Sequence, residues 1–102
     1  MKSYNKLVRD NIPEYLDSKN IPYEKRIAGE EEYKEELIKK LHEEVGEFLV
    51  EKTEEELSDI IEVVEALKEL PEFLNVEKVR QDKLKNKGGF KNRFIIKGTD
   101  DR

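Results

Sequence analysis

The stretch LHEEVGEFLVEKTEEELSDIIEV, residues 41–63, combines a dense run of acidic side chains with apolar residues at helical spacing. Leu41, Val45 and Phe48 recur at intervals of four and three, and the same rhythm resumes at Leu57. Such spacing is typical of amphipathic helices. The stretch therefore predicts two helices joined by a short turn, and it leaves open whether all of its carboxylates face solvent.

Apolar spacing, capping residues and the positions of proline and glycine predict the other elements of the chain. The first long helix spans about 30–51, and Thr53 caps a second one that ends near Leu70, before a proline. A short helix that Asp10 caps ends near residue 18, and an extended connection covers 20–29. A fourth helix starts after Asn75 and ends at two glycines, 88 and 89. We expect an all-α fold, an antiparallel helical hairpin or bundle of about four helices, in a single domain over residues 1–102.

The last part of the chain has a different pattern. In residues 90–97 apolar and basic side chains alternate, which predicts a short extended C-terminal tail with one polar, basic face.

Composition narrows the class of protein. Of 102 residues, 35% are hydrophobic and 44% are charged, so the core is small and we expect a homodimer or homotetramer. A net charge of -5 argues against nucleic acid as a partner, although the basic stretch RQDKLKNKGGFKNRF keeps salt-dependent binding as an alternative. The absence of cysteine excludes disulfides and thiolate sites. Neither a signal peptide nor a membrane span is recognisable, so a soluble cytoplasmic protein is expected.

The acidic residues of the second long helix fall on two faces. Successive residues turn by about 100°, which places Glu62, Glu65 and Glu69 together on the side opposite the apolar residues. Glu56 and Asp59 lie inside the apolar arc instead. An ionised carboxylate in a low-dielectric interior is costly unless a cation compensates it.

The first long helix presents matching carboxylates. Glu44 lies at the edge of its apolar stripe, and Glu47 follows on the same side. In an antiparallel hairpin these two residues face Glu56 and Asp59, and four carboxylates without His or Cys favour Mg²⁺, or Mn²⁺, over zinc. The competing interpretation is an ordinary solvated face, with Glu56 completing the capping box that begins at Thr53.

At these residues the chain resembles a known family. EEVGE (residues 43–47) is similar to the EExxE motif, and ELSD (residues 56–59) to the ExxD motif, of the MazG-like all-α nucleoside triphosphate pyrophosphohydrolases, which include phosphoribosyl-ATP pyrophosphohydrolase and the dimeric dUTPases. YNKLVRDNIPE (residues 4–14) and KGGFKNRFII (residues 87–96) resemble a branch of predicted house-cleaning pyrophosphatases that begin YNKLVRDKIPE. Two departures are a shorter spacer between the acidic motifs and Asn11 in place of the branch's lysine.

The resemblance implies hydrolysis of a non-canonical or surplus nucleoside triphosphate to the monophosphate and pyrophosphate. In that interpretation Mg²⁺ neutralises phosphate charge and orients the attacking water. The expected metal ligands are Glu44, Glu47, Glu56 and Asp59. Glu47 or Glu43 is expected to act as the general base.

Basic and aromatic residues near the two ends are candidate substrate contacts. Positive charge for the polyphosphate is expected from Lys6, Arg9, Lys87 and Arg93. Tyr4, Phe90 and Phe94 either stack on a base or belong to the core.

Two other functions remain open at this point. Within the same chemistry, the chain could be the phosphoribosyl-ATP pyrophosphohydrolase of histidine biosynthesis. In a different class, it could be a non-catalytic helical interaction or metal-binding module whose acidic cluster serves packing alone.

Overall fold

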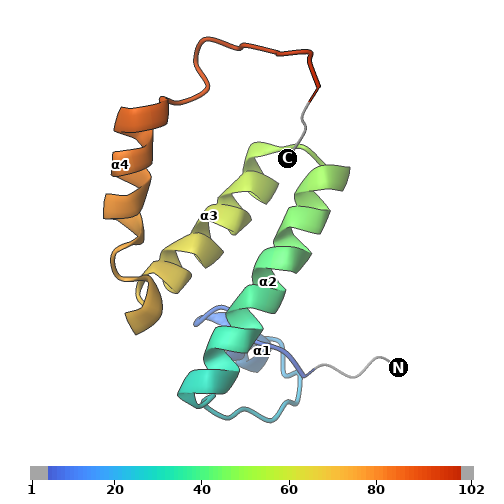
Figure 1. Cartoon of the computed structure of the whole chain (residues 1–102). Coiled ribbons are helices and arrows are strands. Elements are labelled where there is room, and N and C mark those ends of the chain that lie inside the picture. Colours follow the sequence, from blue (N-terminus) through green and yellow to red (C-terminus); the bar gives the residue numbers. More distant parts are fainter. Residues whose placement is uncertain (1–4, 100–102) are drawn as a thin grey trace.

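Two long antiparallel helices, α2 (Glu30–Val50) and α3 (Glu54–Lys68), form the centre of the chain in the computed structural model, which describes residues 5–99 (Figure 1). The short helix α1 (Ile12–Ser18) lies beside the first turns of α2, and α4 (Val76–Lys87) lies beside the end of α3. Residues 5–99 contain no strand. The predicted all-α hairpin with short additions at both ends is confirmed.

A turn of three residues joins α2 to α3. Thr53 is the N-cap of α3 and accepts a hydrogen bond through Oγ1 from the backbone N–H of Glu56, at 3.2 Å. Glu51 closes α2 by donating its N–H to the carbonyl of Glu47, at 2.9 Å. A connection this short leaves the two helices no arrangement other than antiparallel neighbours.

Of the other predicted helix ends, the end of α4 matches the structure and the N-cap of α1 does not. α4 begins after Asn75 and ends at Gly88, whose φ of 81° lies in the left-handed region that glycine tolerates. The prediction that Asp10 caps α1 is wrong, because Asn11 occupies the N-cap position and makes no side-chain capping bond.

The tail after α4 is extended, as its sequence predicts, apart from a turn near its start (Figure 1). Arg93 has a positive φ of 59°, and its N–H donates to the carbonyl of Phe90 at 3.1 Å. This turn precedes residues 94–99, which form neither helix nor strand. Phe90 and Phe94 are 96% and 80% exposed, which excludes them from the core of this chain.

The core between α2 and α3 is thin. Leu37 of α2 is 4% exposed and Val63 of α3 is 9% exposed; among the described residues these are the buried apolar side chains. Lys34 of α2 adds two further contacts. Its Nζ forms an ion pair with Glu72 Oε2 at 2.8 Å and lies 5.9 Å from the centre of the Phe73 ring. Glu72 and Phe73 belong to the short 3-10 helix η1 (Pro71–Phe73) that follows α3, so these contacts hold the start of α2 against η1.

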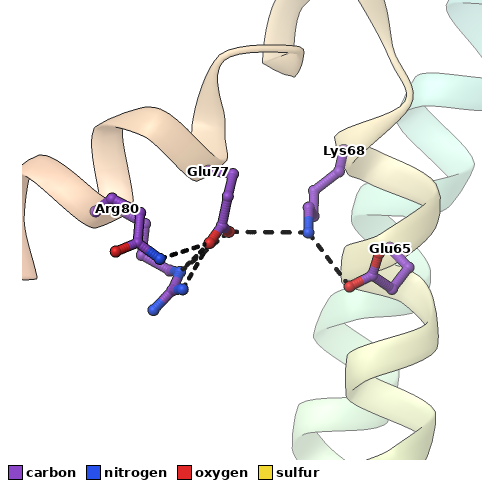
Figure 2. Close-up of polar contacts among 5 residues, drawn as sticks. Glu65, Lys68, Glu77 and Arg80 are labelled. Carbon is purple, nitrogen blue, oxygen red and sulfur yellow. Dashed lines mark hydrogen bonds and ion pairs between the residues drawn. The ribbon is translucent and has the colours of Figure 1, made fainter.

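A chain of polar contacts joins α4 to α3 (Figure 2). Lys68 Nζ lies 3.4 Å from Glu65 Oε1 and 3.9 Å from Glu77 Oε2, and Glu77 in turn accepts from Arg80 Nη2 at 2.6 Å. The hydrogen bonds from Arg80 and then Gln81 lower the pKa of Glu77 to about 2. These ion pairs in α3 and α4 are solvated, and each contributes little to stability.

The surface area and dimensions show how little of the chain packs on itself. Its accessible surface is 10114 Å², whereas a compact monomer of this mass exposes about 6,000 Å². The radius of gyration is 18.4 Å, compared with about 13 Å for a compact domain of 100 residues. No helix within residues 5–99 has the length and apolar character that crossing a bilayer requires.

Truncating the buried leucine tests this thin core. Leu37→Ala should lower the free energy of unfolding by about 2–5 kcal/mol, because it leaves a cavity where α2 contacts α3. Urea unfolding at one fixed protein concentration measures the change. Ile27→Ala, at a position 98% exposed, is the matched control and should change stability by less than about 0.5 kcal/mol. Equal effects of the two substitutions would contradict this placement of the core.

Candidate metal centre

Three carboxylates from two helices converge near the turn of the hairpin. Glu44 projects from α2, and Glu56 and Asp59 project from the first two turns of α3. One oxygen of each lies within 4.8 Å of the others, and all three residues are half-buried. We call these three residues the acidic triad.

The acidic triad does not arise from helix capping. Thr53 caps α3 with its hydroxyl, but its own N–H donates to the carbonyl of Glu51 at 2.8 Å. The Glu56 carboxylate is therefore not needed for the second half of a capping box. Oε2 of Glu56 and Oε2 of Glu44 are both buried and have no hydrogen-bond partner. Buried carboxylate oxygens in this condition are costly, so these two oxygens lack a positive or donating partner.

The pKa values of two carboxyls in the acidic triad are raised, as expected for carboxylate oxygens that lack a positive partner. Burial raises the pKa of Glu44, and the charge and hydrogen bond of Glu47 and the charge of Asp59 raise it further, while Lys40 opposes them. Burial also raises the pKa of Glu56, as do the charges of Glu47 and Asp59. Both groups thus resist ionisation, which a bound cation would reverse.

A guanidinium contacts the third member of the acidic triad. Arg9 lies in the segment that leads into α1, and its Nη2 is 2.7 Å from Asp59 Oδ1, a contact between residues 50 apart in the chain. Arg9, predicted as a substrate contact, is therefore placed at the candidate site.

A hollow opens beside the acidic triad, between the segment before α1 and the α2–α3 hairpin. It has a volume of about 860 Å³ and exposes Glu44 and Asp59 on its wall. The rest of the wall is mixed: it carries apolar side chains, further carboxylates that include Glu62, and the basic and aromatic residues Arg9, Lys40, Lys68, Tyr15 and Tyr33. The hollow is large enough for a nucleotide-sized ligand.

The remaining predicted residues lie in several places. Glu47 is exposed and is not part of the acidic triad, although its charge acts on Glu44 and Glu56. Glu43 is exposed, with its Oε1 4.0 Å from Lys40 Nζ.

The basic and aromatic candidates are scattered along the chain. Lys6 is exposed near the start of the described residues, Lys87 ends α4, and Arg93 lies in the tail; none of the three lines the hollow. Tyr4 falls outside the described residues.

Sequence reasoning missed Lys40. Its signal was present, because Lys40 precedes Glu44 by four residues and shares a helix face with it. The aromatic pair in the hollow, Tyr15 and Tyr33, carried no such signal, since they come from different helices.

The residues present fit a hard divalent cation. The acidic triad supplies only oxygen ligands from three carboxylates, two of which have an orphaned buried oxygen. Mg²⁺ takes one or two carboxylates in most sites and keeps several waters or substrate oxygens, which the adjoining hollow can accommodate. Oxygen donors of this kind do not by themselves separate Mg²⁺ from Mn²⁺.

Comparison with known proteins adds no assignment: no family model matches the chain, and neither the curated proteins nor the solved structures contain a match. The family resemblance therefore rests on the quoted motifs.

The raised pKa values predict how stability depends on pH. A carboxyl whose pKa is higher in the folded state favours folding below its ordinary pKa and loses that contribution as pH rises through the folded value. Glu56→Gln should therefore stabilise the metal-free protein at pH 7, and the gain should shrink as pH falls towards the ordinary carboxyl pKa. Chemical denaturation across this range, with a chelator present, measures it.

Glu54→Gln is the matched control for this measurement. Glu54 and Glu56 both lie in the first turn of α3, so both substitutions remove the same favourable charge from the helix N-terminus. Only Glu56 belongs to the acidic triad, so Glu54→Gln should not stabilise the protein at pH 7. A gain from Glu56→Gln that grows on acidification would contradict the account.

Proposed function

We propose that this protein is a Mg²⁺-dependent nucleotide pyrophosphohydrolase, which hydrolyses a non-canonical or surplus nucleoside triphosphate to the monophosphate and pyrophosphate. The observation that carries the proposal is the convergence of Glu44, Glu56 and Asp59, with two buried carboxylate oxygens that lack partners. The resemblance of EEVGE and ELSD to the motifs of MazG-like enzymes supports the same assignment.

The acidic triad would hold the metal. Mg²⁺ bound there would supply positive charge that offsets the phosphates and would lower the pKa of a coordinated water. Glu44, Glu56 and Asp59 are assigned as its ligands, which leaves Glu47 beside the site with an exposed carboxylate.

Glu47 is the better of the two candidate general bases. Its charge reaches both Glu44 and Glu56, so it lies next to the site, whereas Glu43 faces Lys40. In the reaction Glu47 accepts a proton from the attacking water, the water oxygen bonds to phosphorus, and the α–β anhydride bond breaks. Pyrophosphate leaves with the electrons of that bond.

Of the three cations on the wall of the hollow, Arg9 and Lys40 are the candidates for phosphate contact, because Arg9 contacts Asp59 and the charge of Lys40 acts on Glu44. Arg9 offers a planar fork of donors that suits phosphate oxygens, and Lys40 offers a point charge. We assign these two ahead of Lys87 and Arg93, which do not line the hollow.

We also propose that the chain works as a homodimer or homotetramer. α2 and α3 expose apolar side chains at helical spacing: Ile38, Val45, Leu49, Leu57, Ile61 and Val64. Each chain exposes about 4,000 Å² more surface than a compact monomer of its mass, and these apolar side chains contribute to that excess. A second copy of the chain carries the same apolar face, so two copies can cover each other's apolar side chains through an isologous interface.

Placing a charge on the exposed apolar face tests oligomerisation. The native chain should sediment as a multiple of its 12.1 kDa mass, and Ile61→Asp should shift it to the monomer at the same concentration. Ile27→Asp, in the connection before α2, should leave the mass unchanged. A native monomer at micromolar concentration would contradict the proposal.

Removing one acidic triad ligand tests the enzyme. Pyrophosphate release should be measured with Mg²⁺ and a panel that includes canonical triphosphates, dUTP, oxidised purine triphosphates and phosphoribosyl-ATP. Glu56→Gln and Asp59→Asn should each lower kcat/KM at least about 100-fold, because loss of a ligand exceeds loss of a group that merely orients one. Glu54→Gln should retain native activity.

The panel also separates the alternatives. Turnover of phosphoribosyl-ATP alone would replace the house-cleaning activity with the histidine-biosynthetic one. No turnover of any nucleotide, together with unchanged metal binding by Glu56→Gln and Asp59→Asn, would overturn the proposal in favour of a non-catalytic interaction module.

A further inference from the structure

The contact between Arg9 and Asp59 places a positive charge on a carboxylate that belongs to the acidic triad. Nη2 lies 2.7 Å from Oδ1, a normal distance for a charge-assisted hydrogen bond. Arg9 does not come from either helix that forms the acidic triad; it reaches the site from the segment that precedes α1. The chain therefore brings a cation to the site from an independent part of the fold.

Arg9 compensates the acidic triad only in part. Its guanidinium donates to Asp59, while buried oxygens of Glu44 and Glu56 remain without partners. The side chains of Arg9 and Asp59 are 59% and 32% exposed, and ion pairs with this exposure contribute little to stability. A dication at the acidic triad would compensate all three carboxylates at once.

We infer that Arg9 is the resident counter-cation of the acidic triad, and that a divalent cation binds in competition with it and releases the guanidinium. This inference rests on the metal site of the proposed function and adds a regulatory step to it. Two cations that share one carboxylate repel each other, so occupancy by the dication weakens the hold of Asp59 on Arg9. The affinity for the metal is thereby set partly by a residue that does not ligate it.

Release gives Arg9 a second use. The guanidinium lies on the wall of the hollow, as does Lys40, and a polyphosphate bound there would need positive charge. Without metal, Asp59 occupies Arg9 and the substrate loses a contact. With metal, Arg9 becomes available, so the metal and then the nucleotide bind in that order.

The opposite role for Arg9 makes a prediction of opposite sign. If Arg9 orients Asp59 so that its second oxygen can ligate the metal, removing Arg9 weakens metal binding, as the loss of an orienting partner does. If Arg9 competes, removing it strengthens metal binding. The sign of one measured change therefore decides between the two.

Calorimetric titration with Mn²⁺ and with Mg²⁺, in the absence of nucleotide, measures that sign. Arg9→Gln should bind each metal about fivefold more tightly than the native chain, the size of effect expected from loss of an exposed charge pair. Arg9→Lys should bind like the native chain, because it retains the charge. Arg26→Gln is the matched control, since Arg26 pairs with Glu32 at 2.6 Å but lies outside the acidic triad and the hollow.

Equal or weaker binding by Arg9→Gln, where the native chain binds metal, overturns the competition and leaves the proposed metal site standing. Failure of every variant to bind either metal overturns both. A second readout follows the guanidinium itself: Mg²⁺ should move the Arg9 Nε–Hε resonance and leave that of Arg26 in place. An Arg9 resonance that stays fixed at saturating Mg²⁺ contradicts release.

Discussion

The rest of the structure depends on how the three-residue turn after α2 fixes the register of the hairpin. Because the connection is short and Thr53 caps α3 with its hydroxyl, Glu44 is held opposite Glu56 and Asp59. Like charges that meet in a half-buried position oppose folding unless a cation compensates them. The short turn that sets the antiparallel arrangement of α2 and α3 thus also brings three negatively charged carboxylates together.

That electrostatic problem and the thin core belong together. Leu37 and Val63 are the buried apolar residues of the described chain, and the outer faces of α2 and α3 remain uncovered. An isolated hairpin with this little burial has scant free energy to offset carboxylates that resist ionisation. A second copy would enlarge the core, and a bound cation would relieve the acidic triad, so the two proposals address the same shortage of stability.

Much of this fold could be predicted from local sequence signals. Apolar spacing located α2 and α3, Thr53 marked the cap, and Gly88 marked the end of α4, because each of these depends on neighbours within a few residues. The wheel geometry likewise separated Glu56 and Asp59 from the solvated carboxylates. These predictions succeed because helix periodicity and capping are local properties.

The remaining features depend on contacts that no local pattern encodes. Arg9 meets Asp59 across 50 residues, and Glu47 lies outside the acidic triad because its side chain is one step further round α2 than Glu44. The turn at Arg93 breaks a pattern that reads as extended. Sequence spacing restricts which residues can share a face, but the packing of one helix on another decides which of them meet.

Anomalous diffraction from crystals of the native chain grown with Mn²⁺ tests the central claim most directly. The account predicts a peak bounded by Glu44, Glu56 and Asp59, with carboxylate oxygens at about 2.1 Å, near the distance at which Mg²⁺ is ligated. Saturating Mn²⁺ that leaves the acidic triad without a peak, or that binds only elsewhere on the chain, would contradict it.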